Sequence, residues 1–297
     1  MTATPDNPIN VLITGAAGQA GVALVAAAPP WAAVSAVTRR ELDITDADAV
    51  TAHVRDVAPA VIINAAAYTD VEGAESDRDG AFAVNAQGAD NVARAAAATG
   101  ARLVHFSTDY VFAGDSASPL APDHPVQPIN VYGASKLDGE RRVQQLGDAA
   151  LIVRTSWLYH ASGHNFVKTM LRLMNERDTL SVVADQVGAP TSADTLAHMI
   201  WTAVDRELSG VHHWQDAGVA SWYDFAVAID EIGRQKGLVS TPTAIAPVST
   251  AEFPSKVARP AYSVLDTSST HAALDLPYTH WRTALEATLE SLANANS

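Results

Sequence analysis

Short apolar runs alternate with longer alanine-rich segments through the first half of the chain. The runs are rich in β-branched residues, which is typical of buried parallel strands. The alanine-rich segments, such as 21–28 and 80–98, have the length of helices. Strand alternating with helix predicts an α/β fold with a doubly wound, Rossmann-type parallel sheet. The predicted strands are 10–14, 34–38, 61–64, 103–107 and 151–155.

This alternation ends near Trp157. Apolar spacing then becomes irregular, and Pro and Gly cluster at 187–190 and 258–260. We therefore expect a dinucleotide-binding Rossmann domain over 8–158 and a smaller α+β lobe, mainly for substrate, over 159–297. Some segments of the lobe are expected to return to the Rossmann domain. Helices are predicted at 166–175, 193–207, 222–236 and 281–293.

Composition excludes several classes of protein. The chain has no cysteine, so it has neither disulfides nor thiolate metal sites. Lys and Arg number 19 against 33 Asp and Glu, a net charge of −14 that disfavours nucleic-acid and membrane partners. The amino-terminal segment lacks the basic residues of a signal peptide, and no apolar run reaches the length of a membrane span. We expect a cytoplasmic protein with a small-molecule ligand.

A glycine-rich turn follows the first predicted strand directly. Its glycines have the spacing G-x-x-G-x-x-G and open a predicted helix. Such a turn brings the backbone close to a pyrophosphate, which the free N–H groups of the helix N-terminus then bind. A glycine-rich turn without a ligand is the alternative. The candidate phosphate-binding residues are Gly15, Gly18, Gln19, Ala20 and Gly21.

The end of the second predicted strand bears on the choice of cofactor. Thr38 and Arg39 stand where an acidic residue usually binds the adenosine ribose of NAD. Arginine suits a 2′-phosphate, so NADPH is favoured and NADH stays possible. Asp43 follows and is expected near the adenine, and Ile44 is a further candidate cofactor contact. The alternative is that Arg39 and Arg40 form a solvated pair.

Small residues follow the third predicted strand. They would let a dinucleotide lie flat across the sheet edge, and the alternative is an alanine-rich strand end packed for its own sake. The expected cofactor contacts here are Ala66, Ala67, Tyr68 and Thr69.

A tyrosine and a lysine follow the fourth predicted strand with the spacing of one helical turn. Tyr132 and Lys136 are at i and i+4, so they share one face of a helix. An ammonium beside a phenol favours the phenolate, so we expect Lys136 to lower the pKa of Tyr132 from about 10. Such a phenol can donate and accept a proton. A surface contact between the two side chains is the alternative.

These motifs carry a resemblance. The glycine loop with Tyr132 and Lys136 resembles the extended branch of the short-chain dehydrogenase/reductase superfamily. Two strings, Ser-Thr-Asp-Tyr-Val-Phe at 107–112 and Arg-Thr-Ser-Trp at 154–157, resemble the dTDP-4-dehydrorhamnose reductase family within it. The resemblance runs from about residue 10 to residue 282. Other matching segments are 18–21, 42–46, 64–67 with Thr69, 131–136, 163–166, 185–191 and 259–260.

The resemblance implies an oxidoreductase that completes dTDP-rhamnose synthesis for cell-wall or surface polysaccharide. NADPH would reduce the C4 ketone of dTDP-4-dehydro-L-rhamnose to dTDP-L-rhamnose. Tyr132 would donate the proton, Lys136 would tune Tyr132 and bind the nicotinamide ribose, and Thr108 would assist at the reacting oxygen. Some relatives are magnesium-bridged dimers, but no residue set here is assignable to such a bridge, and the oligomeric state stays open between monomer and homodimer.

The resemblance also implies substrate contacts. Asp109 and Trp157 would contact the sugar, although Trp157 could instead seal the core. Arg259 is the candidate for the pyrophosphate, because a planar guanidinium pairs well with phosphate oxygens. Candidates for the nucleotide end are Asn165, Phe166, the 185–191 loop and Arg259, with Lys168 and Arg172 as alternatives.

Three other readings stay open. Another sugar-nucleotide reductase or an epimerase would use the same scaffold, whereas a dehydratase would carry Glu where this chain has Tyr110. A non-catalytic, NADP-binding regulatory subunit of the methionine adenosyltransferase type would be expected to have lost Thr108, Tyr132 or Lys136. A metal hydrolase would need a third ligand beside His160 and His164, and none is evident, so no metal site is expected.

Overall fold

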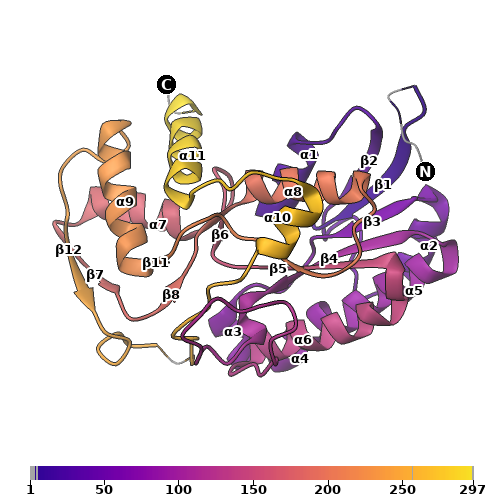
Figure 1. The fold of residues 1–297 in the computed structure, drawn as a ribbon, viewed down its shortest axis with the longest axis horizontal. Coiled ribbons are helices and arrows are strands. Elements are labelled where there is room, and N and C mark those ends of the chain that lie inside the picture. Colours follow the sequence, from indigo (N-terminus) through magenta and orange to yellow (C-terminus); the bar gives the residue numbers. More distant parts are fainter. Residues whose placement is uncertain (1–3, 5, 256, 296–297) are drawn as a thin grey trace.

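The computed structural model describes residue 4 and residues 6–255 and 257–295. Its centre is a sheet of six parallel strands in the order β10-β5-β4-β3-β1-β2 (Figure 1). All the predicted strands lie in it, so the prediction of a Rossmann-type α/β fold is confirmed. The strands are β1 (Ile9–Thr14), β2 (Ala32–Val37), β3 (Val61–Asn64), β4 (Arg102–Thr108), β5 (Ala150–Thr155) and β10 (Gly210–His213).

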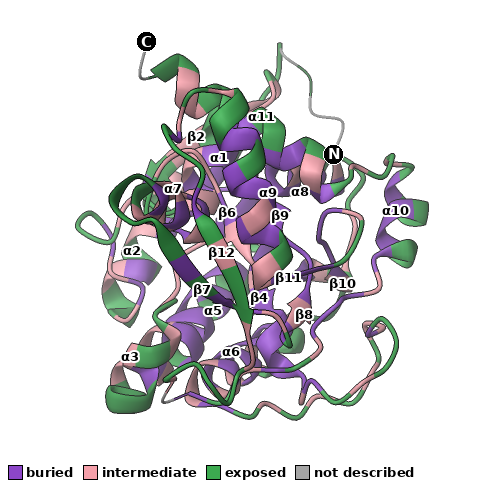
Figure 2. Cartoon of the chain, turned by 90° about the vertical axis from the view of Figure 1, so that its left-hand side faces the viewer, coloured by how far each residue is buried: buried purple, intermediate pink, exposed green. Residues whose placement is uncertain are grey.

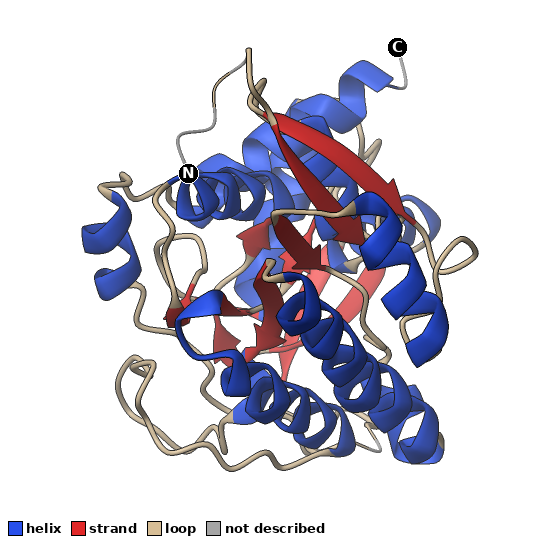
Figure 3. Ribbon diagram, turned by 90° about the vertical axis from the view of Figure 1, so that its right-hand side faces the viewer, coloured by secondary structure: helices blue, strands red, loops and turns tan. Residues whose placement is uncertain are grey.

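Helices cover both faces of this sheet, and Figure 3 shows them in blue on either side of the red strands. On one face, α1 (Gln19–Ala26) packs against α8 (Ala193–Asp205). On the other face lie α2 (Ala47–Val57), α5 (Ala89–Thr99) and α6 (Val131–Val143). The carboxyl ends of the strands therefore meet at one edge, between two helical layers, where ligands of such sheets bind.

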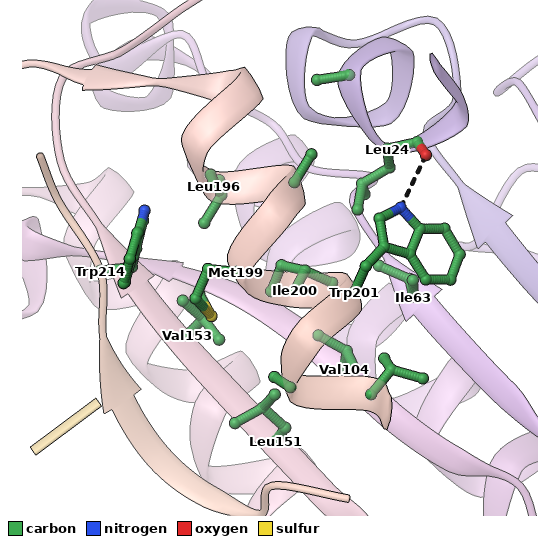
Figure 4. Close-up of a cluster of buried hydrophobic side chains, with 14 of the residues drawn as sticks. Leu24, Ile63, Val104, Leu151, Val153, Leu196, Met199, Ile200, Trp201 and Trp214 are labelled. Atoms are coloured by element: carbon green, nitrogen blue, oxygen red, sulfur yellow. Dashed lines mark hydrogen bonds between the residues drawn. The ribbon is translucent and has the colours of Figure 1, made fainter. Parts of the chain in front are cut away.

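The core under α8 joins the two halves of the chain (Figure 4). Ile200 and Val153 are fully buried there. The indole N–H of Trp201 donates a hydrogen bond to the carbonyl of Leu24 at 3.0 Å, so this polar group is satisfied inside the core. Both α8 and β10 belong to the second half of the chain, which therefore contributes to the sheet domain as well as to the lobe.

The long helix expected over 80–98 is interrupted. It consists of α4 (Arg78–Phe82), a π-helical turn η1 (Ala83–Gly88) and α5, preceded by α3 (Val71–Ser76). The π turn lies against α6, where Gly139 approaches so closely that a Cβ on it would lie 2.1 Å from the carbonyl oxygen of Asn85. Close packing between these helices overrides the continuous helix that the alanine-rich composition favours.

The smaller lobe has its core between three helices. These are α7 (Phe166–Glu176), α9 (Trp222–Gln235) and α11 (Trp281–Ala295). The parallel pair β7 (Thr179–Val183) and β12 (Ala244–Val248) covers one side, and Figure 2 shows that much of its outer surface is exposed. The sequence interpretation missed this pair, because β12 (Ala-Ile-Ala-Pro-Val) is short, contains a proline and has no alternation of apolar and polar residues.

The predicted helices of the second half agree with α7, α8, α9 and α11 to within two residues at each end. Short strands connect the lobe to the sheet domain, with β6 pairing to β9 and β8 to β11. No helix in the described residues is long and apolar enough to cross a membrane. The short elements are η2 (Asp109–Val111), η3 (Gln144–Ala149), β6 (Leu158–Tyr159), β8 (Val187–Gly188), β9 (Thr191–Ser192), β11 (Ala220–Ser221) and α10 (Ser268–Leu274).

Candidate active site

The glycine loop forms the turn from β1 into α1. Gly15 has a φ of +70°, and a Cβ on it would lie 2.5 Å from the backbone nitrogen of Ala66. Only glycine fits this turn, because both the positive φ and the close approach to the end of β3 exclude a side chain. Gly18 is the N-cap of α1, so the free N–H groups of the first helical turn face the same edge of the sheet.

A pocket opens over this loop at the carboxyl ends of β1, β2 and β3. Small and apolar side chains line most of it, which suits the close approach of a dinucleotide. Among the expected cofactor residues, those that line it are Gly15, Gly18, Arg39, Asp43, Ile44, Ala66 and Ala67. Three lining residues that were not singled out as contacts are Ala17, Leu42 and Ala65. Each of these three residues is next in sequence to a predicted contact, and this adjacency could have identified them.

Charged side chains after β2 lie at the mouth of this pocket and contact one another. The side chain of Arg39 is 80% exposed and reaches Asp43 at 3.4 Å. Asp43 also accepts hydrogen bonds from the backbone N–H and hydroxyl of Thr45, which lower the pKa of its carboxyl. The carboxylate of Glu41 accepts hydrogen bonds from the hydroxyl and the backbone N–H of Thr38.

The other expected cofactor residues do not line this pocket. Gln19 accepts a hydrogen bond from Asn165 at 2.8 Å, so it joins the glycine loop to the first turn of α7. The backbone of Tyr68 exchanges two hydrogen bonds with the side chain of Asn85. Ala20, Gly21 and Thr69 also lie outside the pocket lining. Their contact with a cofactor stays a prediction.

The catalytic candidates lie on α6 and at the end of β4. Asn130 caps α6 by accepting a hydrogen bond from the backbone N–H of Gly133 at 2.8 Å, which fixes where the helix begins. Tyr132 and Lys136 therefore share one helix face, as predicted. The ammonium of the buried Lys136 donates a hydrogen bond to the carbonyl oxygen of Phe106 in β4.

Burial governs the proton equilibria of this pair. Desolvation raises the pKa of Tyr132, the charge of Asp109 adds to that shift, and the nearby Thr108 hydroxyl only partly opposes it. The expectation of a lowered Tyr132 pKa is therefore wrong for this structure, because desolvation of the phenol dominates and the negative charge of Asp109 acts in the same direction. Desolvation lowers the pKa of Lys136 to about 8, and Glu140 one turn further along α6 opposes that shift.

Thr108 and Asp109 end β4 beside Tyr132. The hydroxyl of Thr108 donates to Asp109 at 3.0 Å and accepts from the backbone N–H of Tyr110 at 3.1 Å. Both residues are buried, and desolvation raises the pKa of Asp109 to about 6 against hydrogen bonds from Ser263 and Thr108. The structure thus brings Thr108, Asp109 and Tyr132 together.

The other expected substrate residues lie after β5 and at the start of α7. Trp157 follows β5 and stacks on Trp222, with ring centroids 3.6 Å apart, and Phe166 lies 4.7 Å from Trp222. Asn165 caps α7 in addition to its contact with the glycine loop. Trp157 also packs against the lobe core, which agrees with the alternative that this residue seals the core.

Arg259 lies beside the catalytic group and not in the pocket over the glycine loop. Its guanidinium is 3.3 Å from the hydroxyl of Tyr110 and 3.4 Å from the carboxylate of Glu72. The ring of Tyr110 in turn makes an edge-to-face contact with Tyr132 at 5.6 Å.

Asn85 is a positioning residue that the sequence interpretation missed. Its amide bonds the backbone of Tyr68 after β3 and the hydroxyl of Ser135 on α6, at 2.9 Å. It therefore ties the edge of the cofactor pocket to the helix that carries Tyr132. An asparagine in an otherwise apolar helical segment was the available signal, since such a residue favours side-chain contacts over a helix interior.

The histidine pair does not converge. His160 contacts Ser162 at 2.7 Å and Asp194 at 3.4 Å, whereas His164 lies 3.5 Å from Thr169. Among the residues that the structure describes, no group of three or more His, Cys, Asp or Glu could hold a metal ion.

A parallel sheet that runs from strand into a glycine loop, with Tyr132 and Lys136 beside Thr108 at the same edge, defines a short-chain dehydrogenase/reductase of the extended type. The model of the family described as RmlD substrate binding domain matches residues 9–294. The chain belongs to the dTDP-4-dehydrorhamnose reductase family.

Individual relatives agree over nearly the whole chain. A dTDP-4-dehydrorhamnose reductase of Streptomyces griseus is 42% identical over 288 residues, covering 95% of this chain and 93% of the relative. That of Salmonella typhimurium is 38% identical over 293 residues, covering 96% and 98%. The crystal structure of a Bacillus anthracis dTDP-4-dehydrorhamnose reductase in complex with NADP has a TM-score of 0.91 and 41% identity, covering 96% of this chain and 99% of that one.

Proposed function

We propose that this chain reduces the C4 ketone of dTDP-4-dehydro-L-rhamnose to dTDP-L-rhamnose, with NADPH as the preferred reductant. The observation that carries the proposal is the group of Tyr132, Thr108 and Lys136 at the sheet edge, next to the pocket over the glycine loop. The names of the relatives and the NADP in the Bacillus anthracis structure support it.

The pocket fits a nicotinamide dinucleotide. The turn at Gly15 has no room for a side chain, and the lining by Ala65, Ala66 and Ala67 leaves the backbone open to a pyrophosphate. NADPH, when bound, supplies the hydride. The guanidinium of Arg39 is free to turn toward a 2′-phosphate, because it is mostly exposed and only loosely paired.

The proton comes from Tyr132. Its raised pKa keeps the phenol protonated at neutral pH, so it serves as an acid toward the developing alkoxide. Thr108 lies beside Tyr132 and would donate to the same oxygen by turning its hydroxyl away from Asp109. Lys136 holds a positive charge on the same helix face and is the residue expected to bind the nicotinamide ribose. Thr108 and Lys136 are buried and Tyr132 is partly buried, which limits the access of water to the proton transfer.

The substrate is expected to lie between these residues and the lobe. Asp109 and Trp157 would contact the sugar, while Asn165 and Phe166 would border the nucleotide end. Arg259 would meet the pyrophosphate, an anion that could replace the weak contact with Glu72.

The direct test is to measure turnover of the substrate, which is generated in situ. Purified protein would be mixed with NADPH and with dTDP-glucose that a dehydratase and an epimerase convert to dTDP-4-dehydro-L-rhamnose. We expect loss of nicotinamide absorbance only when both upstream enzymes are present, together with dTDP-rhamnose by mass spectrometry and chromatography. NADPH binding without turnover would overturn the proposal and favour a different sugar nucleotide or a regulatory role.

A further inference from the structure

Trp157 has a strained backbone. Its φ is +47°, a left-handed conformation that is uncommon for a bulky aromatic residue. The flanking contacts hold it there: the hydroxyl of Ser156 donates to the carbonyl of Ala189 at 2.9 Å, and the carbonyl of Trp157 accepts from the N–H of Thr191 at 3.3 Å. Strain that the surrounding structure maintains is typical of ligand-binding positions.

The Trp157 indole is held on two sides. Trp222, the first residue of α9, stacks on it in parallel, with 9° between the ring planes. Gly188 lies against the Nε1–Cε2–Cζ2 side, where a Cβ would lie only 2.7 to 2.9 Å from those indole atoms. Gly188 has no positive φ, so its backbone does not require glycine. What requires it is the space that Trp157 occupies.

Trp157 lies close to the catalytic group. It follows β5 by two residues, and Thr155, the last residue of β5, is the register partner of Thr108 in β4. The strand pairing therefore brings the indole to the edge of the sheet that holds Tyr132. Trp157 is only partly buried although it borders the lobe core, so part of the indole stays accessible.

We propose that Trp222 and Gly188 are positioning residues that hold the Trp157 indole as a preformed apolar wall for the C–H face and methyl group of the 6-deoxyhexose. This inference rests on the proposed function. It assigns a purpose to 185–191, which the sequence interpretation placed at the nucleotide end. An indole already fixed in the binding geometry loses little rotamer freedom when the sugar arrives, and that favours affinity.

Three variants and one control test the proposal. Trp222→Leu removes the stack, Trp222→Phe retains a ring, and Gly188→Ala pushes on the indole without straining its own backbone. Trp31→Leu is the matched control, because Trp31 is a partly buried tryptophan that packs edge-to-face on Trp201 in the sheet domain. The measurements are KM for the keto sugar, KM for NADPH, kcat, and the far-UV circular dichroism couplet of stacked indoles.

For Trp222→Leu and Gly188→Ala we expect KM for the keto sugar to rise roughly three- to tenfold, the scale of one lost aromatic contact. KM for NADPH and kcat should stay near wild type, the couplet should be lost in Trp222→Leu, and Trp222→Phe should recover much of the sugar affinity. A merely structural role would lower all parameters together or none of them.

An unchanged KM for the sugar in folded Trp222→Leu and Gly188→Ala would overturn the inference. If Trp222→Leu does not fold, Gly188→Ala decides alone, and its effect should shrink in a Trp157→Phe background because phenylalanine lacks the indole atoms that Gly188 faces. Failure of the proposed function is distinguishable, since the wild-type protein would then not turn over the keto sugar at all.

Discussion

At the scale of single residues, burial moves the pKa values of Tyr132 and Lys136 in opposite directions. The phenol is held protonated and the ammonium is brought within reach of deprotonation. The sequence predicted both residues and their shared helix face from the i, i+4 spacing. It could not predict the sign of the Tyr132 shift, because that depends on desolvation of the phenol and on the nearby charge of Asp109, which the spacing does not show.

These shifts predict the pH dependence of the reaction. The pKa of Lys136 is about 8, so its charge is present below that pH and lost as the pH rises through it, whereas Tyr132 keeps its proton over the same range. We expect kcat/KM to fall on the alkaline side with an apparent pKa of about 8. A profile that stays flat well into the alkaline range, measured with NADPH affinity in parallel, would contradict this.

Arg39 predicts the discrimination between cofactors. Removing its guanidinium in Arg39→Ala should raise KM for NADPH roughly tenfold, the scale of one charge-assisted contact, and leave KM for NADH nearly unchanged. The neighbouring Arg40, which does not line the pocket, provides the matched control Arg40→Ala. Equal effects on the two cofactors would show that Arg39 does not meet the 2′-phosphate.

At the scale of elements, a buried ion pair fixes α6 against β5. Arg154 donates two hydrogen bonds to Glu140, each at 2.9 Å, and a third to the carbonyl of Pro122. Both charged side chains are at most 4% exposed. Glu140 is one turn beyond Lys136, so this pair also sets the orientation of the catalytic helix. From the sequence, Arg154 was noticed only as part of the Arg-Thr-Ser-Trp string. Its partner Glu140 is fourteen residues away, and no local pattern indicates that the two side chains pair.

This ion pair predicts a large loss of stability. Arg154→Ala leaves a buried carboxylate without its partner and should lower the free energy of unfolding by about 3–5 kcal/mol. The control Arg172→Ala removes an exposed pair with Glu176 and should cost less than about 1 kcal/mol. Urea unfolding followed by circular dichroism measures both, and equal losses would contradict the assigned role of Arg154.

At the scale of the whole molecule, two lobes meet over one edge of the sheet. Alternation of apolar runs and helical segments predicted that sheet and most of its helices, since buried parallel strands carry a strong local signal. The pair β7 and β12 was missed because both strands are short and β12, which contains a proline, has no alternation of apolar and polar residues. The position of Arg259 could not be predicted either, because its contacts with Tyr110 and Glu72 join segments that are far apart in the chain.

The contact between Gln19 and Asn165 shows how the lobes share the site. One residue belongs to the glycine loop and the other caps α7, so a ligand in the cofactor pocket lies beside the lobe that would hold the sugar. That arrangement is what a hydride transfer between two bound molecules requires, since the reacting atoms must be held together.

The central claim is that Tyr132 donates the proton in a ketone reduction, and Tyr132→Phe tests it most directly. With the keto sugar and NADPH, kcat/KM should fall roughly a hundredfold to ten-thousandfold while NADPH affinity changes less than about twofold. The control Tyr278→Phe alters a tyrosine that is 60% exposed and should have no effect. Activity of Tyr132→Phe close to that of the wild type would contradict the account.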